Sequence, residues 1–108
     1  MDDRRRAPRY GVEVSGIIRS GSSGEDSVII SNLSVDGCRF SSPRRRIAAG
    51  TALTMAVGPV DLLQARVAWR TGAVHGVTFD QPLHPAVLDH VRLFLSAEPA
   101  LIEERPAA

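Results

Sequence analysis

Four arginines lie within the first nine residues of the chain, at positions 4, 5, 6 and 9. A guanidinium group is a planar fork of N–H donors, which can grip a phosphate or the edge of a base with two parallel hydrogen bonds. Pro8 interrupts this segment and biases Ala7 toward extended backbone, so the segment is not the interior of a helix. The pattern predicts an arm that either binds an anionic ligand or is a solvated run of charge.

A second polar cluster covers residues 32–37, with the sequence Asn-Leu-Ser-Val-Asp-Gly. Residues two apart on a strand point to the same side, so Asn32 and Ser34 are expected to present an amide and a hydroxyl side by side. Gly37 would let the backbone come close to whatever these groups hold. Taken alone, the cluster is also typical of an ordinary strand-to-turn passage, because Asn, Ser and Asp are common turn formers.

Together, the two clusters resemble the PilZ domain family. Arg5 and Arg9 have the spacing RxxxR before the first expected strand. Asn32, Ser34 and Gly37 have the spacing (D/N)xSxxG after the second. The resemblance covers most of the chain, up to about residue 96, and includes a segment similar to the GxxF of the family's closing strand, Gly76-Val77-Thr78-Phe79.

The resemblance implies both a fold and a ligand. PilZ domains are small six-stranded barrels that bind the bacterial second messenger cyclic di-GMP. By similarity, Arg5 and Arg9 would grip guanine edges and phosphate. Asn32 and Ser34 would hold the guanine base and a neighbouring phosphate, and Gly37 would permit close approach.

Further candidates for the same site are ranked lower. Arg4 and Arg6 would suit two stacked ligand molecules, whose four negative charges need more cation, or they serve solubility alone. Asp36 lies in the turn itself. Arg39 is two positions beyond Gly37, where it either approaches a phosphate or is a surface arginine at a strand edge.

The composition excludes several kinds of chemistry. All 13 basic residues are arginine, so the lysine needed for P-loop nucleotide hydrolysis or for a Schiff base is missing. Cys38 is the only cysteine, which excludes an internal disulfide and any CxxC arrangement. The three histidines are not spaced as metal ligands, and no catalytic triad is recognisable. We therefore assign no catalytic residue, no metal and no cofactor besides the ligand.

Length and charge limit the class of protein. A chain of 108 residues supports one compact domain, and a net charge of +1 argues against a globally basic nucleic-acid-binding surface. The N-terminus is charged, and no apolar run approaches the ~20 residues that span a bilayer. The expectation is a cytoplasmic protein without a membrane span.

Hydrophobic alternation predicts an all-β fold, a small six-stranded antiparallel barrel with one C-terminal α-helix. Trp69 and Phe79 fall on inward registers and are predicted to lie in the core. The arginines at 44–46 are predicted to lie in a solvated loop. The expected strands are at residues 10–18, 27–31, 38–40, 51–57, 63–69 and 77–79.

The spacing of apolar residues changes at His84, from the alternation typical of strands to the spacing typical of a helix. Pro85 suits the first helical turn and Pro99 ends the helix, which would cover an open end of the barrel. The apolar face is predicted to contain Val87, Leu88, Val91, Phe94 and Leu95. The predicted organisation is an arm at 1–9, a barrel with its helix at 10–96 and a loose tail at 97–108.

These observations favour a cyclic di-GMP receptor that orders its N-terminal arm on binding and signals through a protein partner. One alternative is a PilZ-like adaptor that no longer binds nucleotide. A less favoured one is a small-barrel RNA- or DNA-binding protein, against which stand the +1 charge and the lack of an expected exposed aromatic platform. The downstream partner, the number of ligands per site and the oligomeric state stay open.

Overall fold

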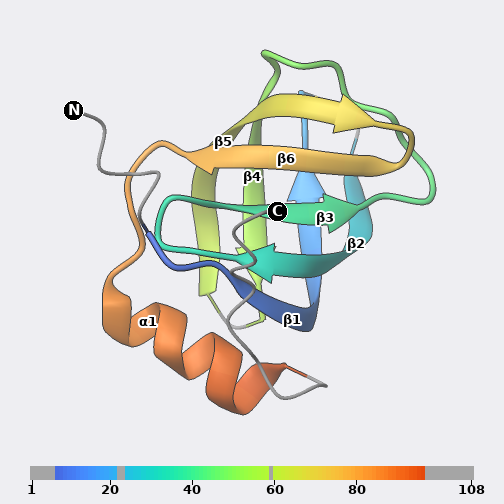
Figure 1. Cartoon of the computed structure of the whole chain (residues 1–108). Helices are drawn as coiled ribbons and strands as arrows, with labels where there is room; N and C mark the ends of the chain where they lie inside the picture. The colour runs from blue at the N-terminus through green and yellow to red at the C-terminus, as the bar shows by residue number, and fades with distance from the viewer. Residues whose placement is uncertain (1–6, 22–23, 59, 97–108) are drawn as a thin grey trace.

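The computed structural model describes residues 7–21, 24–58 and 60–96. Its strands form a closed antiparallel barrel in the order β1-β2-β3-β6-β5-β4, with β1 also paired to β4 (Figure 1). This architecture confirms the predicted fold class. The strands are β1 (Tyr10–Arg19), β2 (Glu25–Leu33), β3 (Gly37–Ser41), β4 (Ala52–Val57), β5 (Val60–Thr71) and β6 (Val74–Phe79).

The interior of the barrel is filled by alternate residues of every strand. Along β1, buried and exposed positions alternate from Val12 to Arg19, as the period of two predicts. Phe40 and Ile30, from β3 and β2, are fully buried. Burying each such side chain contributes about 1.5–3 kcal/mol, so this shared interior stabilises all six strands together.

The prediction that Trp69 lies in the core is wrong. On β5, Val67 pairs with Val77, yet Trp69 pairs with Gly76, so one extra residue is inserted at Ala68. Such a β-bulge reverses which face the following residues occupy. Trp69 is therefore on the outer wall, with 44% of its surface exposed, whereas Phe79 is buried as predicted.

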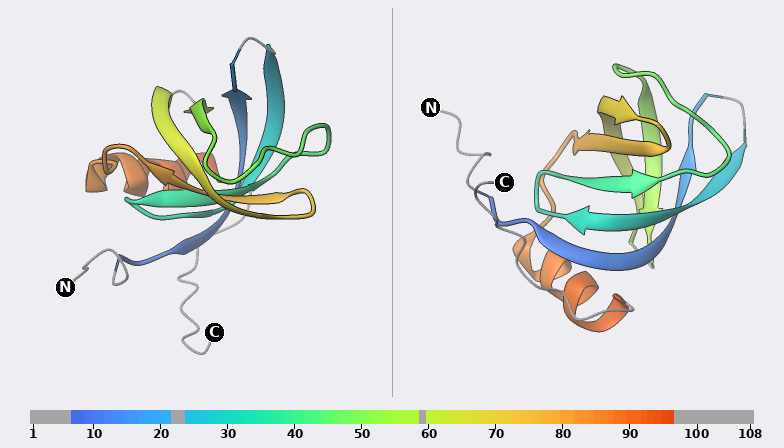
Figure 2. Two further views of the ribbon diagram at one scale, coloured as in Figure 1. Left: turned by 90° about the horizontal axis from the view of Figure 1, so that it is seen from above. Right: turned by 45° about the vertical axis from the view of Figure 1, so that its right-hand side comes forward.

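The C-terminal helix lies outside the barrel beside β1 (Figures 1 and 2). It comprises α1 (Pro85–His90), with Pro85 in its first turn as predicted, and one π-helical turn, η2 (Val91–Leu95). Leu88 and Val91 are buried against the barrel. The prediction that Phe94 shares this apolar face is wrong: its side chain is 73% exposed, because the wider π-turn rotates it away from the helical repeat.

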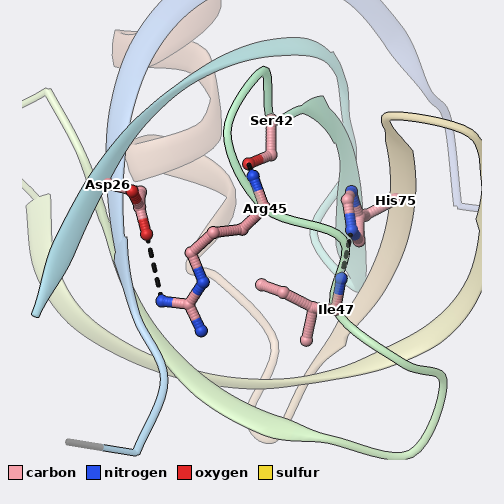
Figure 3. Close-up of polar contacts among 5 residues, drawn as sticks. All are labelled: Asp26, Ser42, Arg45, Ile47 and His75. Carbon is pink, nitrogen blue, oxygen red and sulfur yellow. Dashed lines mark hydrogen bonds and ion pairs between the residues drawn. The ribbon is translucent and has the colours of Figure 1, made fainter. Parts of the chain in front are cut away.

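The connection between β3 and β4 is anchored at several points (Figure 3). The Arg45 guanidinium forms an ion pair with Asp26 of β2 at 3.0 Å, and the Arg45 backbone N–H donates to the Ser42 hydroxyl. The Ile47 N–H donates to Nε2 of the buried His75 at 3.0 Å. The prediction of a solvated loop is therefore right for the exposed Arg44 and Arg46 and wrong for the half-buried Arg45.

His75 makes the stability of the barrel depend on pH. Burial lowers the pKa of His75, although a hydrogen bond to the Ala73 carbonyl opposes this shift; nearby Arg70 and Arg46 lower the pKa further. Protonation would remove the lone pair that accepts the Ile47 N–H. The group is neutral in the folded state, so its contribution is intact above the unfolded pKa of about 6.5 and is lost as the pH falls below it.

We expect the free energy of unfolding in urea to be lower at pH 5.5 than at pH 7.5, a range in which carboxylates with ordinary pKa values near ~4 stay ionised. His75→Gln keeps an acceptor and cannot titrate, so its unfolding free energy should change less between the two pH values. An equal change in both proteins would contradict the assignment.

Candidate functional site

The turn between β2 and β3 is held by hydrogen bonds within the turn, from the end of β6 and from the segment after β6. The Ser34 N–H donates to the Gly37 carbonyl at 2.9 Å, and the Ser34 hydroxyl accepts from the Asp36 N–H at 3.1 Å. The carbonyls of Val35 and Asp36 accept from the N–H groups of Leu83 and Phe79, both at 2.8 Å. The segment that leaves β6 thus fixes this turn, and a rigid turn presents its side chains in one geometry.

Arg9 lies directly on this turn. Its Nε donates to Oδ1 of Asn32 at 2.6 Å, and its Nη1 is 3.5 Å from the Ser34 hydroxyl, a weaker contact. The pairing of Tyr10 with Leu33 places the start of β1 beside the end of β2. Three predicted site residues, 23 and 25 positions apart along the chain, are therefore brought together.

Asn32 and Ser34 are buried polar side chains, 1% and 0% exposed. Such groups are costly unless they form hydrogen bonds, and the exposed Arg9 satisfies part of this requirement from the solvent side. The result is a cation held by an amide and a hydroxyl at the barrel surface. This arrangement offers guanidinium donors to an anion or to a hydrogen-bond acceptor on a base.

Gly37 is explained by strand packing. A Cβ at this position would lie 2.1 Å from the carbonyl oxygen of Val77 on β6, a neighbour that is backbone and cannot turn aside. Glycine is thus required for β3 to approach β6. The predicted role of Gly37 toward a ligand stays a prediction.

A row of cross-strand neighbours continues from Asn32 around the outer wall. Asn32 pairs with Arg39 on β3, Arg39 pairs with Gly76 on β6, and Gly76 pairs with Trp69 on β5. A pocket of about 310 Å³ lies along the β3, β6 and β5 part of this row, lined among others by Arg9, Arg39, Trp69 and Gly76. The structure thus places Arg39 with the predicted site and adds Trp69 to it.

Trp69 was not predicted at this site, because uninterrupted alternation along β5 assigns it to the core. One signal was available. A glycine inside a strand often marks a place where another group approaches closely, and Gly76 occupies such a position in β6. Aromatic side chains are known to cover such glycines from the neighbouring strand.

Cys38 is a buried, free cysteine among the residues that line the pocket. Burial raises the pKa of its thiol to about 12, and the positive charge of Arg9 opposes this shift. The thiol is therefore neutral at physiological pH, and only the thiolate is a good nucleophile.

Several predictions fall outside the described residues. Arg4, Arg5 and Arg6 of the predicted arm and the predicted tail at 97–108 are among these. Asp36 is within the described part, where its backbone N–H and carbonyl both take part in the turn.

Other parts of the described structure are less suited to an anionic ligand. A second, larger hollow of about 470 Å³ is lined by residues such as Ile17, Ile29 and Pro43, with no charged side chain among its lining in the described residues. Within the described ranges, no three His, Cys, Asp or Glu side chains come together as metal ligands. None of the described helices combines the length and the apolar character needed to cross a membrane.

The chain matches a known protein family. The family model described as PilZ domain matches residues 3–97. Among curated proteins, none matches the chain. The matched range contains both polar clusters and the whole barrel.

We predict that Gly37→Ala destabilises the barrel by about 1–3 kcal/mol, the usual cost of overpacking, because the added methyl group collides with the Val77 backbone. Urea unfolding measures this change. Ser41→Ala on the same strand is the control and should leave the unfolding free energy nearly unchanged. Unaltered stability in Gly37→Ala would show that β3 and β6 need no glycine at their contact.

Proposed function

Because the chain belongs to the PilZ domain family, a family that in general binds cyclic di-GMP, we propose that it is a receptor for this dinucleotide and has no catalytic role. The observation that carries the proposal is the Arg9 guanidinium, held on Asn32 and Ser34 at the edge of a pocket that Arg39 also lines. The charge, the donors and the hollow occur together at this one place on the barrel wall.

The chemistry of this site suits the ligand. Cyclic di-GMP carries two phosphate charges and two guanine bases. An arginine fork donates two parallel hydrogen bonds to O6 and N7 of guanine, which is worth about 1–3 kcal/mol of discrimination against another base. Arg9 and Arg39 supply such forks, while lysine, absent from this chain, would supply only a point charge.

Arg9 is positioned before any ligand arrives. The 2.6 Å bond from its Nε to Asn32 holds the guanidinium against the turn. A side chain that is already ordered loses less conformational entropy on binding, which improves affinity. Asn32 and Ser34 therefore act first by orienting Arg9, and they contact the base and phosphate when Arg9 moves onto the ligand.

The second part of the proposal concerns the arm. Ordering backbone costs about 1–2 kcal/mol per residue, so six ordered residues would cost about 6–12 kcal/mol. A single hydrogen bond to a charged group returns about 1.5–3 kcal/mol, so several arginines, Arg5 among them, must bind together. The ligand then closes the arm over the barrel and creates a new surface for a protein partner.

The described residues support a route from the arm to the helix. Tyr10, directly after Arg9, lies under the Arg92 guanidinium, 4.3 Å from the ring centroid. The Glu13 N–H donates to the Ser96 hydroxyl at 2.9 Å. A change at Arg9 therefore reaches the helix through direct contacts with β1.

The exposed Trp69 bears on the RNA- or DNA-binding alternative. The expected lack of an exposed aromatic platform was an argument against that function, and this argument no longer holds because Trp69 is 44% exposed beside the arginines. The net charge of +1 still argues against it.

Calorimetric titration with cyclic di-GMP, GTP and a short RNA at two salt concentrations separates the candidate functions. A receptor binds cyclic di-GMP selectively, with a modest dependence on salt. A nucleic-acid-binding protein binds RNA with an affinity that falls steeply as salt increases. Binding of none of the three favours the adaptor alternative.

Arg9→Ala should weaken cyclic di-GMP binding at least about tenfold, or about 1.4 kcal/mol, because both the charge and the fork are lost. Arg9→Lys retains the charge and should also bind more weakly than the natural protein, because lysine does not form the bidentate pair. Calorimetry measures both affinities.

The control for these variants is Arg19→Ala. Arg19 forms an exposed ion pair with Glu25 at the opposite end of β1, and its removal makes the same change in net charge. Its affinity for cyclic di-GMP should stay near that of the natural protein. If Arg9→Ala and Arg9→Lys bind cyclic di-GMP with the same affinity as Arg19→Ala, the role of Arg9 is refuted.

A further inference from the structure

The larger hollow of the barrel wall, about 470 Å³ in volume, shares no lining residue with the arginine-lined pocket among the described residues. Ile17 of β1 and Ile29 of β2 give it an apolar surface and are 36% and 46% exposed. Ser15 pairs with Ile29 and Ser27 pairs with Ile17, so the two isoleucines are diagonal neighbours on one face of the sheet. Two branched apolar side chains are thus left in contact with water.

The hollow is open because the other side chains that line it are short. Ser27, Ala56 and Gly58 lie around the two isoleucines and do not extend as far from the sheet. Exposed apolar surface of this kind often marks a contact with another segment of protein. A segment that fits here has branched apolar side chains of its own.

The C-terminal helix ends at the edge of this hollow. A Cβ added to Gly58, one of its lining residues, would lie 2.9 Å from Cδ1 of Leu95. The Ser96 hydroxyl accepts a hydrogen bond from the Glu13 N–H of β1 at 2.9 Å. Two separate contacts therefore hold the end of the helix beside the hollow.

The chain after Ser96 is long enough to enter the hollow. Glu13 and Ile17 are on the same face of β1, four residues apart, which is about 13 Å along a strand. Leu101 follows Ser96 by five residues, and five extended residues span up to about 17 Å. Leu101 is thus within reach of Ile17 while the hydrogen bond between Ser96 and Glu13 stays in place.

The sequence that follows the helix has a composition complementary to the hollow. Two adjacent branched apolar residues, Leu101 and Ile102, are followed by two glutamates. The exposed Arg44 follows Pro43, which lines the hollow, so a positive charge is close to the apolar surface. Because exposed ion pairs contribute little to stability, the apolar contact is the main source of affinity and the charges favour one orientation.

We propose that the hollow at Ile17 and Ile29 is the docking site of the chain's own C-terminal segment, residues 97–108, and that Leu101 and Ile102 are the side chains that enter it. This inference goes beyond the proposed function and does not rest on it. Docking would extend the attachment of the C-terminal helix from β1 to β2 and remove the two isoleucines from water.

Attachment to the helix favours this segment over a separate partner. The bond between Ser96 and Glu13 fixes the start of the segment beside the hollow. A tethered segment binds with an effective concentration in the millimolar range for a short linker, whatever the concentration of the protein. Even a weak apolar contact is therefore formed within the chain before a separate partner competes for it.

Methyl NMR of the natural 108-residue protein tests the contact directly. Nuclear Overhauser effects arise only between methyl groups that lie close together. We expect cross peaks from Leu101 or Ile102 to Ile17 or Ile29. Absence of these cross peaks, or cross peaks from Leu101 and Ile102 to another part of the barrel, would overturn the proposal.

A sample that mixes two differently labelled copies identifies the molecule that supplies the segment. Docking within one chain gives no cross peaks between the labelled and the unlabelled copies. Cross peaks that occur only between copies would assign the hollow to a second copy of the chain and overturn the proposal.

A double-mutant cycle measures the contribution of the contact to stability. Replacing both Leu101 and Ile102 with Ser should lower the Tm by about 4 °C or more, and Ile29→Ser should lower it as well. The protein with all three substitutions should lose less than the sum of the two losses, because one contact can be removed only once. Fully additive losses, or an unchanged Tm after the change at Leu101 and Ile102, would overturn the proposal.

The control for the cycle is Leu93→Ser. Leu93 is on η2, is 56% exposed and does not line the hollow. Its effect on the Tm should add to that of the change at Leu101 and Ile102. If Leu93→Ser departs from additivity as much as Ile29→Ser does, the coupling is not specific to the hollow and the proposal fails. None of these measurements uses cyclic di-GMP, so their result is independent of the proposed function.

Discussion

Closure of the barrel is the constraint on which the rest of the structure depends. Each strand pairs with a neighbour on both sides, so β1 must pair with β2 and β4 at once. This fixes Tyr10 opposite Leu33 and brings Arg9 onto Asn32. The same closure aligns Asn32, Arg39, Gly76 and Trp69 in one row across four strands. The candidate site is therefore a consequence of strand register, and a shift of one residue would move its members to opposite faces.

The polar turn between β2 and β3 contributes to stability and also positions the residues of the candidate site. Asn32 and Ser34 are buried, so they must be hydrogen-bonded for the barrel to be stable, and the turn and Arg9 supply these bonds. The same bonds orient the guanidinium toward the pocket. The side chains that stabilise the turn thereby also hold Arg9 at the pocket, and the end of β6 and the segment after it keep the turn rigid through Asp36 and Val35.

The β-bulge at Ala68 changes which residues of β5 face outward. One additional residue on β5 reverses the alternation and exposes Trp69 on the wall that carries Arg39. Gly76 makes room for the indole because it has no side chain of its own. The bulge therefore places a residue that alternation assigns to the core on the outer wall, beside the pocket that Arg9 and Arg39 also line.

Hydrophobic alternation and turn residues were sufficient to predict the strands and most of the core, because they act over a few positions. The grouping of Arg9 with Asn32 and Ser34 was expected from the resemblance to PilZ domains, because no local pattern relates residues 23 and 25 positions apart. Tertiary structure alone decided four further features. The bulge that exposes Trp69 depends on pairing with β6, and the packing need for Gly37 depends on the Val77 carbonyl. The ion pair of the half-buried Arg45 joins it to Asp26, 19 residues away. The π-turn that exposes Phe94 ends at Leu95, whose side chain lies close to Gly58. Each depends on contacts between residues distant in the chain, whose register no local period specifies.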